Sequence, residues 1–150
     1  MKKKSFLLVL TLVSLTSCNF NSFYTDRKSD KEDAESVTTK FYYLLRDKKY
    51  QDTYKLFSPR FLEITNESKI KDIYDASDNK LGSIKDQNLI SWKTNIVEGS
   101  NPKSEYLLVY EVKREKFISK ETIRLEKEND TIKILAYNVQ SDGFLDTGIK

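Results

Sequence analysis

The hydrophobic residues of this chain follow a helical period up to Gly82 and a strand period after it. Before Gly82, apolar side chains recur three or four residues apart, which is typical of amphipathic helices. After Gly82, apolar and polar residues alternate, and clusters of turn-forming residues separate the alternating segments. Helices followed by antiparallel strands define an α+β fold. We therefore expect the first half of the chain to form helices that pack on a sheet made from the second half.

Capping residues and a glycine mark the ends of the predicted helices. Ser29 and Glu32 form a capping-box pattern at the start of the first helix. Ser58-Pro59 closes the second helix and suits the start of a further turn, with serine as the cap and proline at the first helical position. Gly82 is expected to end the third helix in the left-handed conformation. The three helices are predicted over residues 30–47, 50–57 and 67–80.

Four strands are predicted in the second half, joined as a meander. Asn129-Asp130 separates the last two strands and suits a two-residue hairpin. The second strand is almost wholly apolar, so we expect it to be central and covered on both faces. Alternation places Ile90, Trp92 and Ile96 on one face of the first strand, and Ile132, Ile134 and Ala136 on one face of the last. The strands are expected over residues 88–97, 106–112, 117–127 and 131–140.

The N-terminus has the pattern of an export signal. Three lysines precede an apolar run over residues 6–15. A helix of that length rises about 15 Å, half of what a bilayer requires, so residues 1–17 are predicted to be a signal peptide and not a membrane span. Its end, Leu15-Thr16-Ser17-Cys18, resembles the bacterial lipoprotein box. The resemblance implies that a diacylglyceryl group with fatty chains such as palmitate is attached to the Cys18 thiol and that Cys18 becomes the first mature residue.

This resemblance predicts a protein anchored to a membrane of the bacterial cell envelope. The alternative is an ordinary secreted protein with a free cysteine. Asn19, which is not aspartate, follows Cys18, and similarity to the enterobacterial sorting rule favours the outer membrane, with the periplasmic or surface face left open. Residues 18–29 are interpreted as a tether whose Phe20, Phe23 and Tyr24 either enter the membrane interface or are disordered. Residues 30–142 are the expected domain, and 143–150 a frayed tail.

Composition excludes several classes of function. The chain contains no histidine, which removes Ser/His/Asp and Cys/His catalysis and most zinc sites. Three of its 26 basic residues and none of its 23 acidic residues lie in the predicted signal peptide, so the mature chain is balanced in charge. Neither a basic patch for nucleic acid nor a glycine-rich phosphate loop occurs. We expect no cofactor, no metal and no nucleic-acid partner.

The second half of the chain resembles a known bacterial family. The residues that carry the similarity are Leu81-Gly82, Pro102, Glu105-Tyr106, Phe117, Glu121 and Ala136-Tyr137. They resemble domain of unknown function 4019, within the cystatin-like or nuclear-transport-factor-2-like (NTF2-like) superfamily. The resemblance implies a cone in which N-terminal helices pack against a curved, four-stranded antiparallel sheet. Such cones often enclose an apolar pocket, which enzymes of the superfamily line with Asp, His or Tyr. The family supplies no catalytic set to carry over.

Aromatic residues are the main candidates for a binding site in such a cone. Trp92, Tyr106 and Tyr110 are the candidate pocket residues, because an apolar ring with a polar group suits a ligand site. The alternative is that these rings fill the cone as core. Glu121 lies in a strand that faces or flanks the cone, where a buried carboxylate suits acid or base chemistry; edge charge that discourages strand pairing explains it equally well.

Two other groups of charged residues are interpreted as solvated surface. Asp72, Asp75 and Asp78 share a helix face but fit no calcium loop or transition-metal ligand set. Residues 113–116 are predicted to be a solvated turn.

The leading hypothesis is therefore an envelope lipoprotein whose domain binds a small apolar ligand or an envelope protein without catalysis. One alternative is an NTF2-like enzyme that uses Glu121 or a pocket tyrosine. Another is a structural or inhibitory protein that uses the exposed sheet.

Overall fold

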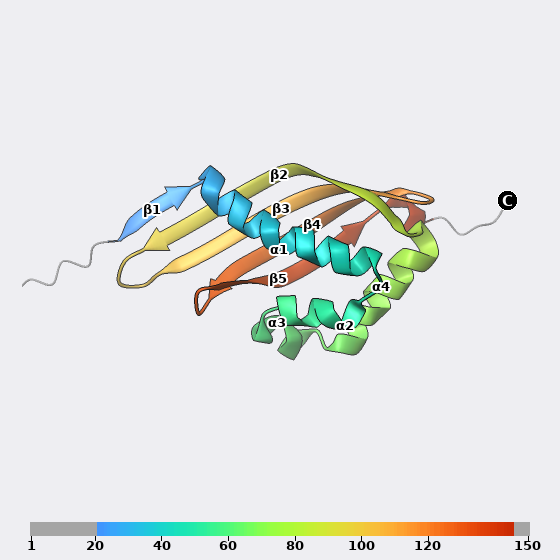
Figure 1. Cartoon of the computed structure of the whole chain (residues 1–150), viewed down its shortest axis with the longest axis horizontal. Helices are drawn as coiled ribbons and strands as arrows, with labels where there is room; N and C mark the ends of the chain where they lie inside the picture. The colour runs from blue at the N-terminus through green and yellow to red at the C-terminus, as the bar shows by residue number, and fades with distance from the viewer. Residues whose placement is uncertain (1–20, 146–150) are drawn as a thin grey trace, which may run out of the picture.

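The computed structural model describes residues 21–145, in which helices lie on one face of a five-stranded antiparallel sheet (Figure 1). The predicted α+β class is confirmed, whereas the predicted number of four strands is wrong. The predicted signal peptide, Cys18 and Phe20 lie outside the described residues, as does the end of the predicted tail. The elements are β1 (Ser22–Thr25), α1 (Lys28–Arg46), α2 (Tyr50–Thr53), η1 (Tyr54–Leu56), α3 (Pro59–Ile64), α4 (Glu67–Leu81), β2 (Ile84–Glu98), β3 (Lys103–Arg114), β4 (Ile118–Glu128), β5 (Thr131–Gln140) and η2 (Asp142–Phe144).

The additional strand, β1, comes from the segment that was interpreted as a tether. It pairs antiparallel with the end of β2, from Ser22 opposite Glu98 to Thr25 opposite Asn95. Asp26 then fixes the turn into α1: its backbone N–H donates to the Thr94 carbonyl at 3.1 Å, and its Oδ1 accepts from the Thr94 N–H at 2.9 Å. Four residues are too few for a period to identify a strand, and the pairing partner lies some seventy residues later.

Helix α1 begins two residues earlier than predicted and is not capped by Ser29. Its N-cap is Arg27, which makes no side-chain capping bond. Instead, the Arg27 guanidinium binds Asp30 at 2.7 Å and Glu98 at 3.3 Å, so an ion pair to β2 fixes the start of the helix. The capping-box prediction is wrong because Ser29 is already inside the helix. The buried stripe of α1 comprises Asp30, Ala34, Thr38, Phe41, Tyr42, Leu44 and Leu45.

Two side-chain caps begin the later helices. The Ser58 hydroxyl accepts from the Phe61 N–H at 3.1 Å, and Pro59 occupies the first turn of α3, as predicted. The Ser58 N–H donates to the Ile134 carbonyl at 2.9 Å, which joins this segment to the free edge of β5. Asn66 caps α4 in the same way, and the buried face of α4 comprises Ile70, Tyr74, Ser77 and Leu81.

Gly82 ends α4 with a positive φ, but not in the left-handed helical conformation that was predicted. Its φ is 82° and its ψ is 177°, a region open essentially to glycine alone. The extended ψ leads directly into β2 beside the β3–β4 turn, where Lys116 N–H donates to the Leu81 carbonyl and Glu115 N–H to the Ser83 carbonyl, both at 3.0 Å. A Cβ on Gly82 would lie 2.5 Å from the Glu115 Cβ.

The sheet is a meander in the order β1-β2-β3-β4-β5, with β3 in the centre. Its helix-facing residues on β3 are Tyr106, Leu108, Tyr110, Val112 and Arg114, all buried. The alternate residues, such as Leu107 and Val109, are only half-buried. The prediction that this strand is covered on both faces is therefore wrong, because the helices of residues 21–145 all pack on one face (Figure 1).

Two register shifts change the faces that alternation predicted. Between Leu89 and Ser91 the pairing with β3 slips by one residue, which leaves Ile90 exposed and returns Trp92 to the helix side, opposite Leu108. Leu135 is the extra residue in β5, so Ala136 pairs with the outward Arg124. Ile90 and Ala136 thus do not share the faces expected of them, because a bulge reverses the parity of all residues beyond it.

Turn residues after β4 and after β5 define the last hairpin and the C-terminal end of the domain. Asn129 and Asp130 both have positive φ, 45° and 62°, which confirms the predicted two-residue hairpin. After β5, the Ser141 hydroxyl donates to the Ile118 carbonyl at 2.7 Å. Gly143 in η2 is buried, and a Cβ there would lie 2.6 Å from Leu81 Cδ2. The domain therefore extends past residue 142, into the start of the predicted tail.

Candidate functional site

Glu121 is a fully buried carboxylate, and both of its oxygens are hydrogen-bonded. Its side chain is 0% exposed. Oε1 accepts from Arg114 Nη2 at 2.8 Å and Nε at 3.2 Å, and from the Ser119 hydroxyl at 2.8 Å. Oε2 accepts from the Tyr137 hydroxyl at 2.7 Å and the Tyr42 hydroxyl at 3.2 Å. A buried carboxylate is tolerated only when it is paired and hydrogen-bonded in this way.

Strand register and the α1 stripe bring these groups together. Ser119 and Glu121 alternate on the helix side of β4, and Glu121 pairs with Tyr110 on one side and Val139 on the other. Arg114 continues the inward alternation of β3 to the end of the strand. The expectation of a solvated turn at residues 113–116 is therefore wrong for Arg114, whose side chain is 2% exposed. The uninterrupted alternation from Tyr106 was the signal that could have identified it.

The surroundings keep the donors of this network protonated. Burial lowers the pKa of Arg114, but the charge of Glu121 and their hydrogen bonds outweigh it, so the pKa is raised overall. Burial, together with the charge of Glu121, raises the pKa of Tyr42 and of Tyr137 well above that of a free tyrosine. Both phenols and the guanidinium therefore remain donors throughout the neutral pH range.

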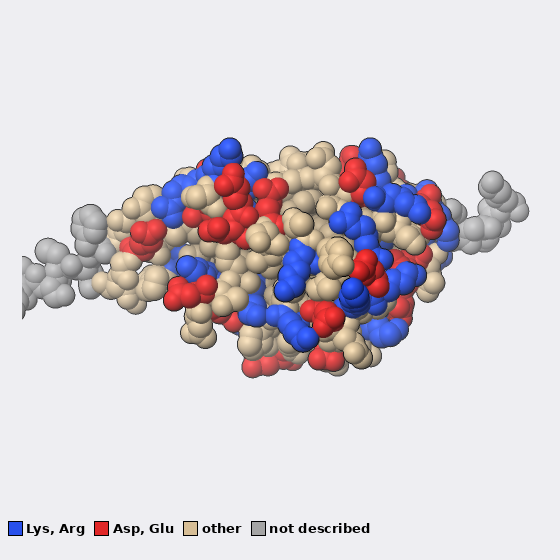
Figure 2. Space-filling view, in the orientation of Figure 1, with Lys and Arg blue, Asp and Glu red and all other residues tan. Residues whose placement is uncertain are grey.

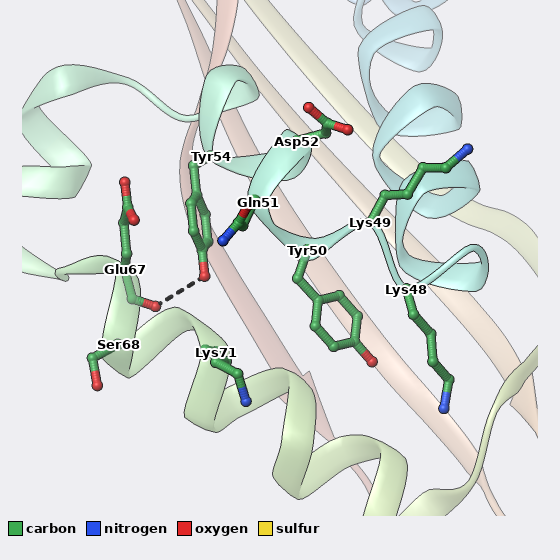
Figure 3. Close-up of a pocket in the computed structure, with 9 residues that line it drawn as sticks. All are labelled: Lys48, Lys49, Tyr50, Gln51, Asp52, Tyr54, Glu67, Ser68 and Lys71. Atoms are coloured by element: carbon green, nitrogen blue, oxygen red, sulfur yellow. Dashed lines mark hydrogen bonds between the residues drawn. The ribbon is translucent and has the colours of Figure 1, made fainter.

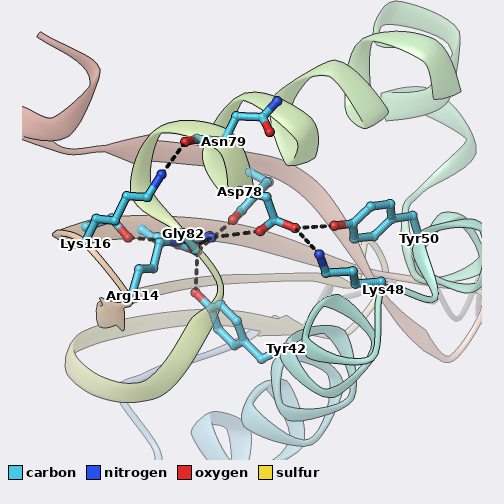
Figure 4. A network of polar contacts seen from close by, with 11 residues as sticks. Tyr42, Lys48, Tyr50, Asp78, Asn79, Gly82, Arg114 and Lys116 are labelled. Atoms are coloured by element: carbon cyan, nitrogen blue, oxygen red, sulfur yellow. Dashed lines mark hydrogen bonds and ion pairs between the residues drawn. The ribbon is translucent and has the colours of Figure 1, made fainter. Parts of the chain in front are cut away.

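The network continues from Glu121 to the surface (Figure 4). Arg114 Nη1 donates to the Gly82 carbonyl at 3.3 Å and lies 3.6 Å from Asp78 Oδ1. Asp78 Oδ2 accepts from the Tyr50 hydroxyl at 2.6 Å and lies 3.7 Å from Lys48 Nζ. Burial and the hydrogen bond to Asp78 raise the pKa of Tyr50. A continuous chain of polar contacts thus joins the α1–α2 loop to the core.

Asp78 differs from the two aspartates that share its helix face. Asp72 is exposed, and Asp75 forms an ion pair with Lys71 on the helix surface. The expectation of a solvated face therefore holds for Asp72 but is wrong for Asp78, which is drawn inward by Arg114.

No substrate-sized space lies beside Glu121 among the described residues. The hollow that reaches Arg114 has a volume of about 10 Å³, which is room for about one water molecule. Leu45, Tyr50, Tyr74, Ser77, Asp78 and Ile84 line the remainder of it. In this arrangement the carboxylate holds the fold together and does not face a cavity.

The three aromatic pocket candidates face the helices, but they do not enclose a common cavity. Tyr106 and Tyr110 are 6% and 5% exposed. The Tyr110 hydroxyl shares a 2.6 Å hydrogen bond with the Thr38 hydroxyl, and burial raises the pKa of Tyr110 to about 12. Trp92 is half-buried and borders, with Tyr110 and Glu35, an open hollow of about 520 Å³ between α1 and β2. The interior of the domain is filled by side chains.

A groove lies between the α1–α2 loop, α2 and the start of α4 (Figure 3), and we name it the α2–α4 groove. Its volume is about 630 Å³. The Tyr54 hydroxyl crosses it to donate to the Glu67 carbonyl at 3.2 Å. Sequence patterns did not reveal this groove, because no motif joins its segments. It is lined by Lys48, Lys49, Tyr50, Gln51, Asp52, Tyr54, Glu67, Ser68 and Lys71.

The groove has a mixed polar and apolar surface and is nearly balanced in charge. Lys49 lies 2.9 Å from Asp47, Lys71 pairs with Asp75, and Lys48 approaches Asp78. Lys48 and Tyr50 belong both to the groove wall and to the buried network. The groove is therefore fastened to the core through Asp78 and Arg114.

Two features are absent from residues 21–145. No cluster of three or more His, Cys, Asp or Glu side chains there is arranged to hold a metal ion. No helix in the same range has the length and apolar character needed to cross a membrane. In comparisons with known proteins, the chain matches no protein-family model, no curated protein and no solved structure.

Proposed function

We propose that the protein is a lipid-anchored protein of the bacterial cell envelope whose domain binds a protein partner without catalysis. Leu15-Thr16-Ser17-Cys18 supports the anchor, with Cys18 as the attachment site and, by the sorting resemblance, the outer membrane as the favoured location. Two long acyl chains, at about 0.8 kcal/mol per buried methylene, hold a protein on a membrane effectively permanently.

The observation that carries the proposal is the filled interior. Glu121 already accepts hydrogen bonds from Arg114, Tyr42, Tyr137 and Ser119, and only about 10 Å³ of space reaches this network. This argues against acid or base catalysis by Glu121, because a catalytic carboxylate must reach the proton that it transfers. The filled interior also argues against the small apolar ligand, because Tyr106 and Tyr110 serve as core.

The α2–α4 groove is the contact surface that the geometry favours. Protein interfaces are enriched in tyrosine, and the polar rim around their core is accessible to solvent. Tyr50 and Tyr54 present half-buried rings there beside lysine, glutamate and amide groups. Tyr50 donates to Asp78 and Tyr54 donates to the Glu67 carbonyl, and these hydrogen bonds keep the wall ordered, which lowers the entropy cost of binding.

We also infer that the domain belongs to the cystatin-like or NTF2-like superfamily and, within it, to domain of unknown function 4019. The order of helices followed by a meander supports this inference. So do the positions of the residues that carry the resemblance: Gly82 ends α4, and Glu105-Tyr106 lies near the start of β3. Strand β1 is an addition to the four-stranded pattern that the resemblance implies.

In-cell photo-crosslinking tests the proposal. A photoreactive phenylalanine analogue is placed at Gln51 in the groove and, as a matched control, at Arg124 on the outer face of β4; both positions are exposed. We expect a defined protein adduct from position 51 and none from position 124. Adducts from position 124 alone would favour the alternative that the exposed sheet is the binding surface. The absence of adducts from both positions would contradict partner binding.

A further inference from the structure

We propose that the end of the domain formed by β1 and the β2–β3 turn lies directly against the membrane, with Phe23 in the lipid interface. The α2–α4 groove at the opposite end then faces away from the bilayer. This inference rests on the proposed lipid attachment at Cys18 and concerns the orientation of the domain, which the attachment alone does not define.

The length of free chain after Cys18 is the first argument. Strand β1 begins at Ser22, and the Asn21 side chain accepts from the Ser100 N–H at 3.1 Å. Three peptide units join Cys18 to Asn21, which span at most about 11 Å. An unstructured tether over residues 18–29 would instead reach roughly 18 Å on average and more when extended. Because the structure binds residues 21–25 to β2 and its turn, most of that reach is lost.

The short link between Cys18 and Asn21 is comparable in length to the thickness of the headgroup layer. A bilayer is about 30 Å thick in its hydrocarbon core and 40–45 Å in total, so each headgroup layer occupies roughly 5–8 Å. The acyl chains place the Cys18 sulfur near the boundary of the core. A link of about 11 Å therefore brings Asn21 at most about 3–6 Å beyond the outer edge of the headgroups. The strand that follows must begin at the membrane surface.

The side chains on this part of the sheet suit a lipid interface. Phe23 is 74% exposed, on the outer side of β1. Phe23 pairs with Val97, and Val97 pairs with Lys103, so an aromatic, an aliphatic and a lysine side chain lie side by side on the outer face. An exposed aromatic flanked by a lysine is typical of interfacial contact, because lysine buries its stem and keeps its ammonium in water. Tyr24 points inward, and the Arg27 guanidinium carbon lies over its ring, 4.0 Å from the ring centroid. Tyr24 is therefore not available to the lipid.

Electrostatic attraction to anionic lipid does not account for the proposed contact between this end of the domain and the membrane. The basic groups at this end have acidic partners: Arg27 binds Asp30 and Glu98, and Lys127 lies 3.4 Å from Asp130. Figure 2 shows side chains of both signs on this end of the molecule. We therefore expect the orientation to depend on the short link and on Phe23, and to be insensitive to salt and to anionic lipid.

The fold then determines which surfaces are available to other molecules. Ten residues of β3 separate Lys103 from Lys113, which corresponds to about 33 Å along the strand. Lys113 pairs with Asp86 near the start of β2, so Lys85 belongs to the opposite end of the sheet. Figure 1 shows α4 on that side and β1 at the other extreme. A partner of the groove would therefore approach from the side away from the membrane.

Site-specific quenching on vesicles tests the orientation. The full-length, lipidated protein is reconstituted into phosphatidylcholine vesicles that contain lipids with a nitroxide on the headgroup. Lys103→Cys and Lys85→Cys each carry a fluorophore on the new thiol; both lysines are exposed, with side-chain exposures of 64% and 57%. The quencher acts only at short range, so we expect quenching at position 103 at least threefold stronger than at position 85, at both low and high salt.

Variants separate the two causes of the contact. Ten glycine and serine residues inserted between Phe20 and Asn21 should reduce quenching at position 103 to the level at position 85. Phe23→Ser should weaken quenching at position 103, whereas Thr25→Ser, on the same exposed side of β1, should leave it unchanged.

Each contrary result has a different meaning. Equal quenching at positions 103 and 85, on protein that floats with the vesicles, would overturn the orientation alone. Failure of the full-length protein without substitutions to float with the vesicles would overturn the lipid attachment and the orientation with it. Position 103 could also be shielded from the quencher only when many protein molecules occupy each vesicle, and not when few do. That result would show that a second copy of the protein covers this surface, which also contradicts the proposal.

Discussion

Arg114 Nη2 lies 2.8 Å from Glu121 Oε1, and the two side chains are 2% and 0% exposed. They are seven residues apart on the adjacent strands β3 and β4, on either side of the turn that joins them. Asp78 extends the pair to α4, and Tyr42 extends it to α1. One ion pair thus connects the centre of the sheet with both long helices.

Breaking this pair from one side should destabilise the domain strongly. Glu121→Ala leaves the Arg114 charge buried with only the more distant Asp78 beside it, and we expect a loss of about 3–5 kcal/mol. Urea unfolding of the chain from residue 19 measures it. Glu121→Ala combined with Arg114→Met should cost less than the two single changes added together. Additive costs would show that the two groups do not interact energetically in the folded state.

The two tyrosines that donate hydrogen bonds to Glu121 should contribute unequally to the stability of the domain. Tyr137→Phe removes a 2.7 Å hydrogen bond to a carboxylate, and Tyr42→Phe removes one of 3.2 Å. Hydrogen bonds to charged groups contribute about 1.5–3 kcal/mol, so we expect Tyr137→Phe at the upper end and Tyr42→Phe at the lower. Tyr43→Phe is the control, since Tyr43 is 51% exposed on the same helix. A greater cost for Tyr42→Phe would contradict the geometry.

The buried phenols also predict how stability depends on pH. The pKa values of Tyr42, Tyr137 and Tyr110 are raised in the folded protein. A raised folded pKa means that the unfolded chain loses these protons first, near pH 10. The contribution of these phenols to the free energy of unfolding is therefore complete below pH 10. It is lost as the pH rises through their pKa values in the folded protein. We expect the free energy of unfolding to fall above pH 10, and Tyr110→Phe to reduce that slope by roughly 1 kcal/mol per pH unit.

Denaturation curves recorded from pH 8 to pH 12 provide this measurement. A slope that is the same in Tyr110→Phe and in the parent protein would show that Tyr110 is not protected in the folded state.

Gly82 should tolerate no side chain, for two separable reasons. Gly82→Ala places a Cβ at φ 82° and 2.5 Å from the Glu115 Cβ, and we expect a loss of about 1–3 kcal/mol from the backbone conformation alone. Glu115→Gly removes the atom that the new Cβ meets. The double variant should therefore recover the steric part of the loss and retain the backbone part. A melting temperature unchanged by Gly82→Ala would contradict the observed conformation.

Local periodicity predicted the elements that are long and regular. The buried stripes of α1 and α4, the cap at Ser58 and the hairpin at Asn129-Asp130 all follow from short-range patterns. The alternation of β3 also extended to Arg114, but the charged residues around it concealed that signal. An arginine can occupy a core position when a carboxylate such as Glu121 faces it.

Features that depend on distant pairing could not be predicted in this way. Strand β1 exists because Ser22–Thr25 meets the end of β2. The extra residues Ile90 and Leu135 arise from pairing between strands and leave no mark in the local sequence. The groove brings the α1–α2 loop against the start of α4, segments whose contact only the tertiary fold defines.

Cys18→Ser should abolish both processing and membrane retention, because the lipid is attached through the thiol. The measurements are the mass of the protein and its distribution after cell fractionation. Thr16→Ser, a small substitution in the same motif, is the matched control and should leave both unchanged. Recovery of Cys18→Ser in the membrane fraction at the normal level and size would contradict the anchor.

Trp92, the single tryptophan of the chain, gives a test of whether the domain encloses a ligand. Its ring is half-buried on the helix side of β2 and borders an open hollow, so we expect emission between that of a buried and that of an exposed indole. Trp92→Ala should cost about 2 kcal/mol, less than the 3–5 kcal/mol typical of a fully buried aromatic. Long-chain lipids titrated onto the chain from residue 19 should leave the emission unchanged, because buried side chains such as Tyr106 and Tyr110 fill the interior of the domain. A saturable blue shift would instead show that the interior opens to admit an apolar ligand, and would favour ligand binding over a protein partner.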